Sequence, residues 1–175
     1  MKPSEPVPVK LFCGVLYSDE ELLKRALDLM QEKYGEIDFT GKTQKFDSTG
    51  YYNAEMGGPI FRIFYAFALL VSPGRLAKIK IECNEIEDLL AIQQQRKINL
   101  DPGYMDYDKV VLASAKYKGH KIYLDYGIYA DPTLHYVKGH YLPGEYCFPD
   151  FKNGRYEQEF LEIRALYKRQ IRAIE

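Results

Sequence analysis

Residues 9–17 read VKLFCGVLY and are followed at once by residues 18–21, SDEE. The first stretch is apolar on both faces of a strand, which predicts an interior β-strand because an edge strand would leave that surface in water. Ser18 and Glu21 have the S-x-x-E spacing of a capping box, with Ser18 as the expected N-cap. Apolar residues then recur at helical spacing up to Gly35, where a left-handed residue is expected. The chain is therefore expected to open with a strand and a helix.

Two more strands and a second helix are expected next. Residues 37–47 alternate in part between apolar and polar side chains, and residues 59–71 read PIFRIFYAFALLV, rich in β-branched and aromatic residues. Ser72-Pro73 places a cap residue before a proline at the first helical position, and apolar residues recur at helical spacing to about residue 95 or 96. The order up to this point is β-α-β-β-α.

A sixth element completes a split βαβ unit. Residues 109–117 (KVVLASAKY) and 121–129 (KIYLDYGIY) are both strand-like, and the Lys-Gly-His segment between them suits a short hairpin connection. With the first of these strands the order becomes βαββαβ, which predicts an α+β fold with a ferredoxin-like split βαβ core over about residues 9–117. The second strand is expected to extend the sheet.

Residues 118–175 are expected to extend this core. Proline and glycine gather between Asp131 and Asp150, which predicts a loop or an irregular hairpin. A C-terminal helix is expected over roughly residues 156–174, since one face of that segment is apolar and its charges follow the helix dipole. At 175 residues the chain is expected to form a single α+β domain, residues 1–175.

Composition and charge narrow the functional class. Hydrophobic residues make up 46% and charged residues 28% of the chain, which excludes disordered and collagen-like proteins. A net charge of -1 lacks the overall basic surface that phosphate backbones select, so no nucleic-acid partner is predicted. The 16 tyrosines, against no tryptophan, indicate surfaces where an apolar ring carries a hydroxyl group.

The chain ends and the cysteines predict a compartment. The segment before Val9 contains three prolines where a signal peptide would be apolar, and no apolar run is long enough to span a bilayer. Cys13, Cys83 and Cys147 lie far apart, which fits neither a disulfide framework nor a zinc half-site. We therefore expect a cytoplasmic protein with buried thiols and no membrane attachment.

Motifs for phosphate and metal binding fail on spacing. Gly41-Lys42-Thr43 matches the tail of a Walker A motif, but Gly35 lies one residue too far away and follows a predicted helix rather than a strand. The spacing of His120, His135 and His140 suits neither one helical face nor one strand face, so polar loop residues are expected rather than a metal site. No cofactor is predicted.

A long tip between two predicted strands forms the first candidate cluster. Residues 47–59, DSTGYYNAEMGGP, carry Tyr51, Tyr52 and Glu55. A connection of this length without periodicity is usually functional or mobile, so these side chains are candidates to cover a ligand. The alternative is an inert Ω-loop.

The second candidate cluster follows the second helix. Its candidate residues are Arg96, Asn99, Asp101 and Tyr104. Within it, Asp101-Pro102-Gly103 predicts a turn, because proline fixes φ and glycine allows a positive φ. The alternative is that its polar groups only cap local backbone atoms. In a split βαβ topology this segment and the long tip leave the same end of the sheet, so both are expected to face one cavity.

Lys116, Asp131 and Thr133 complete the candidate ligand-binding residues, and two functions fit the set. Arg62, Arg96 and Lys116 supply positive charge near carboxylates, which favours a protein that binds, or acts on, a small anionic or phosphate-bearing ligand. The alternative is a non-catalytic module whose exposed tyrosines bind a protein partner. The sequence does not decide whether the protein is an enzyme.

Four segments carry a family resemblance: YYNAEMG (51–57), RKINLDPGYMDYDKVVLASAKYKGHKIYL (96–124), GIYADPTLHY (127–136) and YCFPDF (146–151). The chain resembles, over nearly its whole length, an uncharacterised family of small bacterial and archaeal proteins described as a domain of unknown function. Some members carry the label "GTP-binding protein". The sequence has neither a Walker A loop nor an N-K-x-D tetrad, so no motif in it supports GTP binding. The resemblance implies no catalytic residues.

Overall fold

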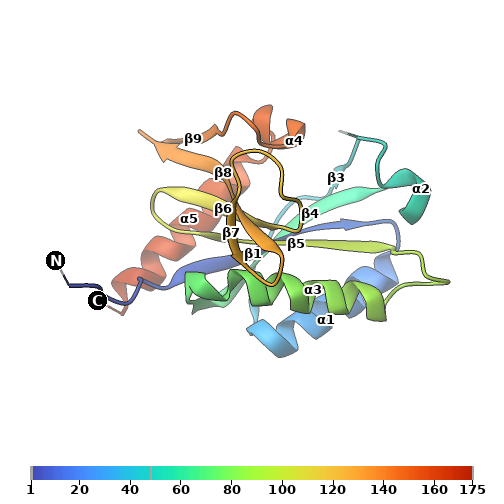
Figure 1. The fold of residues 1–175 in the computed structure, drawn as a ribbon, viewed down its shortest axis with the longest axis horizontal. Coiled ribbons are helices and arrows are strands. Elements are labelled where there is room, and N and C mark those ends of the chain that lie inside the picture. Colours follow the sequence, from blue (N-terminus) through green and yellow to red (C-terminus); the bar gives the residue numbers. More distant parts are fainter. Residues whose placement is uncertain (1, 48, 175) are drawn as a thin grey trace.

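The computed structural model describes residues 2–47 and 49–174, whose strands form a nine-stranded antiparallel sheet (Figure 1). The strand order is β2-β4-β1-β5-β6-β8-β7, with β3 beside β4 and β9 beside β8. The strands are β1 (Val9–Tyr17), β2 (Ile37–Thr40), β3 (Gln44–Lys45), β4 (Phe61–Val71), β5 (Ile98–Met105), β6 (Lys109–Ser114), β7 (Ile122–Asp125), β8 (Ile128–Val137) and β9 (His140–Pro143). The helices are α1 (Glu20–Tyr34), α2 (Asn53–Met56), α3 (Leu76–Leu89), α4 (Pro149–Lys152) and α5 (Glu157–Arg172), with a 3-10 turn η1 (Pro73–Arg75) before α3.

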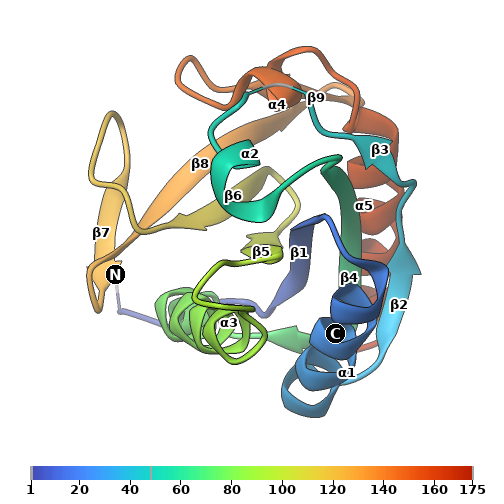
Figure 2. The same cartoon turned by 90° about the vertical axis from the view of Figure 1, so that its right-hand side faces the viewer.

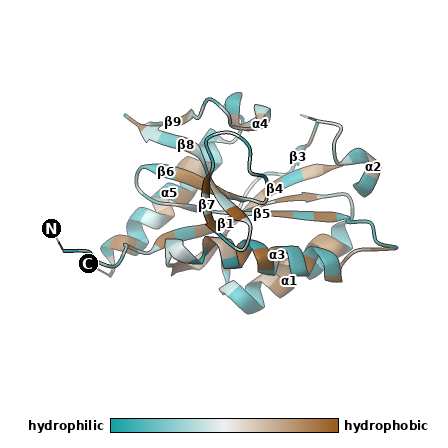
Figure 3. Cartoon of the chain, viewed as in Figure 1, coloured by the Kyte–Doolittle hydropathy of each residue, from teal (hydrophilic) through white to brown (hydrophobic). Residues whose placement is uncertain are grey.

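Strand β1 lies in the interior of the sheet, which confirms the prediction for VKLFCGVLY. It pairs with β4 on one side and with β5 on the other, and all nine of its residues are buried. Leu11 and Val15 pack in the core under α1 and α3, whereas Phe12 packs in the core under α5. Figure 2 shows α1 and α3 side by side, and Figure 3 shows hydrophobic residues concentrated along the central strands. The mixed α and β composition predicted from the sequence is thus confirmed.

Both predicted helix boundaries near the site need correction. Asp19, not Ser18, caps α1: its carboxylate accepts a hydrogen bond from the Leu22 amide at 2.9 Å, because the Ser18 hydroxyl donates to the Met56 carbonyl at 2.8 Å instead. Helix α3 ends at Leu89 rather than near residue 95. Ile92 and Gln95 exchange two backbone hydrogen bonds and close a tight turn that returns the chain to β5.

The predicted turn at Asp101-Pro102-Gly103 is a strand. These residues lie inside β5 and pair with β1, Cys13 standing opposite Pro102. Turn chemistry is a local preference, and here the pairing of eight consecutive residues with β1 overrides it. The predicted long tip is also partly ordered, because it contains the short helix α2; its Ser48 lies outside the described residues.

The hairpin predicted between residues 109–117 and 121–129 is wrong. Strand β6 pairs with β8, and β7 lies at the sheet edge beyond it. The turn falls instead at Tyr126-Gly127, where both residues have positive φ, 54° and 73°, as a two-residue hairpin turn requires. A similar turn at Lys138-Gly139 makes a hairpin of β8 and β9, so His135 and His140 lie in strands rather than in a loop.

Candidate functional site

Strands β5 and β6 diverge, and this fork creates the candidate site. Strand β6 pairs with β5 only at residues 103–105; beyond that point β5 pairs with β1 alone, and β6 pairs with β8. The last rung needs glycine, because a Cβ at Gly103 would lie 2.6 Å from the Val111 carbonyl oxygen. The next residue toward the fork is Pro102. The sheet therefore opens at Pro102-Gly103.

Two charged side chains of α3 take the place of the missing strand. The Leu100 amide donates to Glu87 Oε1 at 2.6 Å, and Lys80 Nζ donates to the Leu100 carbonyl at 2.6 Å. Both backbone groups of Leu100 therefore point away from β1. Backbone groups point to alternate sides along a strand, so those of Pro102, two residues on from Leu100, also face β6. Proline has no N–H, and it therefore cannot donate a further hydrogen bond to β6.

A cleft of about 400 Å³ occupies the fork. Residues predicted for the site that line it are Tyr51, Tyr52, Arg96, Asn99, Asp101, Lys116 and Asp131. Other polar side chains in its wall are Lys80, Asn84, Glu87, Asp88 and Ser114, together with the ring of Phe148. The long tip, β5, β6 and α3 thus contribute to one concave surface.

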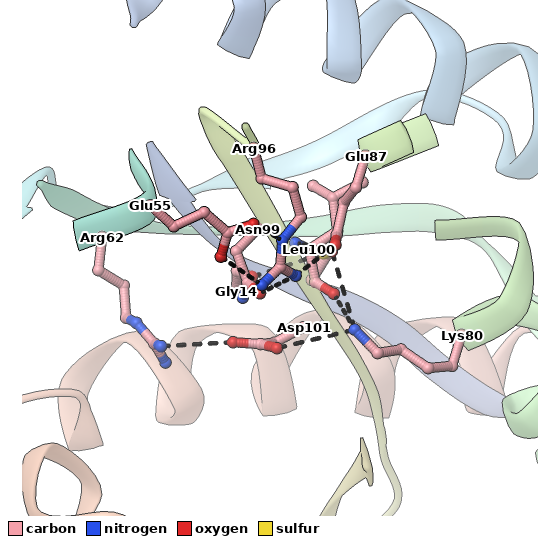
Figure 4. Close-up of polar contacts among 10 residues, drawn as sticks. Gly14, Glu55, Arg62, Lys80, Glu87, Arg96, Asn99, Leu100 and Asp101 are labelled. Atoms are coloured by element: carbon pink, nitrogen blue, oxygen red, sulfur yellow. Dashed lines mark hydrogen bonds and ion pairs between the residues drawn. The ribbon is translucent and has the colours of Figure 1, made fainter. Parts of the chain in front are cut away.

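Asp101 lies between two buried cations in the floor of the cleft (Figure 4). Its carboxylate is 3.4 Å from Arg62 Nη2 and 3.9 Å from Lys80 Nζ. Asp101 is on the sheet face covered by α5, since it alternates with Leu100, which packs under α1 and α3. Lys80 comes from α3 on the other face and therefore reaches Asp101 through the fork. The Lys80 side chain also lies 3.8 Å from Glu87.

Arg96 ties the long tip to the start of β5. Its Nε and Nη2 atoms each donate to Glu55 at 2.8 Å, in a two-point contact that fits the planar guanidinium. Its Nη1 donates to Glu87 at 2.9 Å and to the Asn99 side-chain oxygen at 3.3 Å. The Asn99 side-chain nitrogen is buried and has no hydrogen-bond partner among the described residues.

Burial and pairing act in opposite directions on the two glutamates. Hydrogen bonding to Arg96 holds the pKa of Glu55 below its ordinary value, and the same contact raises the pKa of Arg96. Burial raises the pKa of Glu87, although Lys80 and Arg96 both lie against it. Desolvation therefore outweighs pairing at Glu87, whereas pairing dominates at the more exposed Glu55.

The rim of the cleft is aromatic and basic. Lys116 Nζ lies 4.7 Å from the centre of the Tyr51 ring, and Tyr51 packs edge-on against Tyr52. Burial raises the pKa of Tyr52 to about 12, so this hydroxyl remains a hydrogen-bond donor at neutral pH.

Asp131 is 2% exposed and lies 3.2 Å from His120 Nε2 and 3.5 Å from Lys121 Nζ.

Three of the predicted site residues do not line the cleft. Glu55 contacts it only through Arg96. Tyr104 faces a separate groove at the opposite end of β5, beside Pro73 and Lys109. Thr133 is fully buried, and its hydroxyl donates to the Asp131 carbonyl at 3.0 Å.

Sequence reasoning missed Lys80 and Glu87. They stand seven residues apart, each next to an apolar residue of the α3 core stripe, Ile79 and Ile86. Residues seven apart lie on the same side of a helix, so Lys80 and Glu87 both border its buried face. This spacing was the signal in the sequence that could have identified them.

Residues 2–47 and 49–174 carry neither a cluster of metal ligands nor a membrane-spanning helix. They contain no group of three or more His, Cys, Asp or Glu side chains placed to hold a metal ion. No helix in this part of the chain has the length and apolarity needed to cross a membrane.

Comparison with known proteins gives a family and no function. The model of a family described as a domain of unknown function, DUF4416, matches residues 7–167. No curated protein and no solved structure matches the chain. The matched region includes the strands that form the fork and every residue that lines the cleft. The chain belongs to the DUF4416 family.

Proposed function

We propose that the cleft binds a small anionic ligand, such as one bearing a phosphate group, that also carries hydroxyl or amino groups. The observation that supports this most is the state of Lys116. The other two cations in the wall, Lys80 and Arg96, each lie within 3.9 Å of a carboxylate. Lys116 is exposed, and no carboxylate among residues 2–47 and 49–174 pairs with it. It is therefore the cation available to a ligand.

The carboxylates in the lining explain why a bare anion is a poor fit. Asp88, Asp101 and Asp131 line the cleft and would repel a second negative group placed beside them. Hydroxyl or amino groups would instead donate hydrogen bonds to these carboxylates. A sugar phosphate has both features. A cleft of about 400 Å³ lies within the range of small-molecule sites.

The proposal includes a fold assignment and a location. The order β2-β4-β1-β5, with α1 and α3 joining strands that are not neighbours, supports the assignment of these elements to a ferredoxin-like split βαβ core. Strand β5, and not the predicted strand at residues 109–117, is then the closing strand of this core, and strands β6 to β9 and α5 extend it. Cys13, Cys83 and Cys147 are free and buried, which fits the cytoplasmic location that we propose.

The experiment compares three probes by thermal unfolding: ribose 5-phosphate, ribose and inorganic phosphate. We expect ribose 5-phosphate to stabilise the protein more than ribose or inorganic phosphate does at the same concentration. At 100 times its dissociation constant the stabilisation by ribose 5-phosphate should be about 2.7 kcal/mol. Lys116→Ala should weaken this effect about tenfold or more, and Lys118→Ala, an exposed lysine outside the cleft, should not. Equal stabilisation by phosphate alone, or an unchanged response of Lys116→Ala, would count against the proposal.

A further inference from the structure

A second, smaller chamber adjoins the inner end of the cleft. Its volume is about 60 Å³, enough for a small polar group or a few water molecules. Tyr52, Asp101, Leu112 and Phe148 line both spaces, so the chamber and the cleft are separated only by these side chains. Arg62 lies in the wall of the chamber but not in that of the cleft.

Arg62 is buried with most of its hydrogen-bonding capacity unused. A guanidinium has five N–H donors, but the Arg62 side chain makes one hydrogen bond to a described residue, from Nη2 to Asp101 at 3.4 Å. Nη1 lies 3.6 Å from Asp150 Oδ2, and the buried Nε has no partner among the described residues. Leaving such donors without partners is costly.

The surroundings of Arg62 explain why the protein itself does not complete these bonds. The guanidinium carbon lies 5.0 Å from the ring centre of Phe46, 5.8 Å from Phe64 and 5.9 Å from Phe151. These rings hold the guanidinium in place but offer no acceptor beyond their faces. An acceptor from a bound molecule would meet the remaining N–H groups.

The charge balance selects the kind of group that fits. Arg62 faces Asp101 and Asp150, and Lys80 is shared between Asp101 and Glu87, so the carboxylates already balance or outnumber these two cations. A further anion would leave uncompensated negative charge in a poorly hydrated space, and an apolar group would leave the donors of Arg62 unsatisfied. A neutral carbonyl group next to an N–H avoids both costs: its oxygen accepts from Arg62, and its N–H donates to a carboxylate.

We propose that the chamber binds the planar, uncharged amide edge of a ligand, a carbonyl oxygen with a neighbouring N–H. The aromatic side chains Phe46, Tyr52 and Phe148 in its wall suit a flat group. This inference rests on the proposed function, because the chamber adjoins the same cleft and shares four lining residues with it. The ligand then has two parts, an amide edge beside Arg62 and an anionic group beside Lys116.

The test uses benzamide and benzoate, which have the same shape and differ in charge and in the amide edge. The probes are titrated into isotope-labelled protein, and the Nε–H signal of Arg62 is followed by NMR; its assignment comes from its absence in Arg62→Lys. We expect benzamide to shift this signal saturably and benzoate to bind there at least about tenfold more weakly. Benzoate binding as tightly as benzamide, or no shift with benzamide, would overturn the inference.

Two further variants locate the binding. Phe148→Trp enlarges a half-exposed side chain that lines both chamber and cleft and replaces none of the buried charged residues, so it should weaken benzamide binding while the protein stays folded. Lys118→Ala should leave benzamide binding unchanged, because Lys118 is exposed and lines neither the cleft nor the chamber. A benzamide response that survives Phe148→Trp unchanged would place the probe elsewhere and refute the inference. Loss of the ribose 5-phosphate response alone would refute the proposed function and leave the chamber standing.

Discussion

Lys10 and Arg62 are buried cations on neighbouring strands, and they differ in how many of their hydrogen-bond donors the protein uses. Lys10 is 0% exposed, and its Nζ donates to Asp38 at 2.5 Å and to the Phe67 carbonyl at 2.8 Å. Arg62, opposite Leu16 at the far end of the β1–β4 pairing, makes a single long hydrogen bond. A buried cation with two short hydrogen bonds to the protein holds the fold together. One left with free donors at a cavity is available to a ligand.

The pKa of Lys10 shows what burial costs even with good partners. Burial lowers this pKa more than the hydrogen bond and the charge of Asp38 raise it. The ion pair therefore adds little net free energy of folding. Removing one partner is nevertheless costly, because it leaves the other charge buried without compensation.

The largest effect is expected at the paired cation. Lys10→Met should lower the free energy of unfolding by about 3 kcal/mol, because Asp38 loses its cation and keeps only the neutral Gln170 side chain as a donor among the described residues, and the Phe67 carbonyl loses the Lys10 hydrogen bond. Chemical denaturation measures the loss. Lys10→Met combined with Asp38→Asn should recover part of it, since no uncompensated charge then remains. If the single variant were as stable as the natural protein, Lys10 would not be a structural charge.

A smaller effect is expected when the charge at position 62 is kept. Arg62→Lys should cost about 1 kcal/mol, because one long hydrogen bond is lost while the two carboxylates still face a cation. The same denaturation experiment checks it. A loss as large as that of Lys10→Met would remove the contrast between the two cations and make the guanidinium a structural element.

The smallest effect concerns the partly exposed pair of Arg96 and Glu55, and it depends on pH. Because the pKa of Glu55 is lowered in the folded protein, the pair stabilises the fold above the ordinary pKa of a glutamate and loses this effect as pH falls through the lowered value. Glu55→Gln should therefore cost about 0.5 kcal/mol at neutral pH and progressively less below about pH 4.

The control for this prediction is Glu85→Gln. Glu85 is exposed on α3 and has no ion pair with a described residue, so its replacement should give no such pH-dependent difference. Unfolding curves of both variants at neutral and acid pH make the comparison. A constant difference between Glu55→Gln and the natural protein across this range would show that the pair does not titrate with folding.

Local patterns in the sequence predicted the elements well where one pattern acts alone. The first strand, α1 and most of α3 follow from apolar periodicity, because each buries its apolar residues in a core that such a pattern anticipates. Topology predicted that the long tip and the Arg96–Tyr104 segment face one cavity. Arg96 contacts Glu55 of the tip, whereas Tyr104 faces a separate groove at the opposite end of β5.

The errors arose where a distant strand decides the local structure. Asp101-Pro102-Gly103 has turn chemistry, but β1 pairs with it throughout. Tyr126-Gly127 lacks the Asn or Asp that usually marks a two-residue hairpin, so the turn was placed too early. Lys80 and Glu87 have a role only because β6 leaves β5, which no local pattern reveals.

Pro102 keeps the fork between β5 and β6 open because its ring nitrogen carries no hydrogen to donate to β6. Any other residue at this position would supply an N–H facing β6, and the two strands could then continue their pairing by one rung toward the cleft. The space could thus be narrowed without changing a single residue that lines it. A comparison of related chains that scores only the lining residues would overlook such a loss, whereas the residue at position 102 would reveal it.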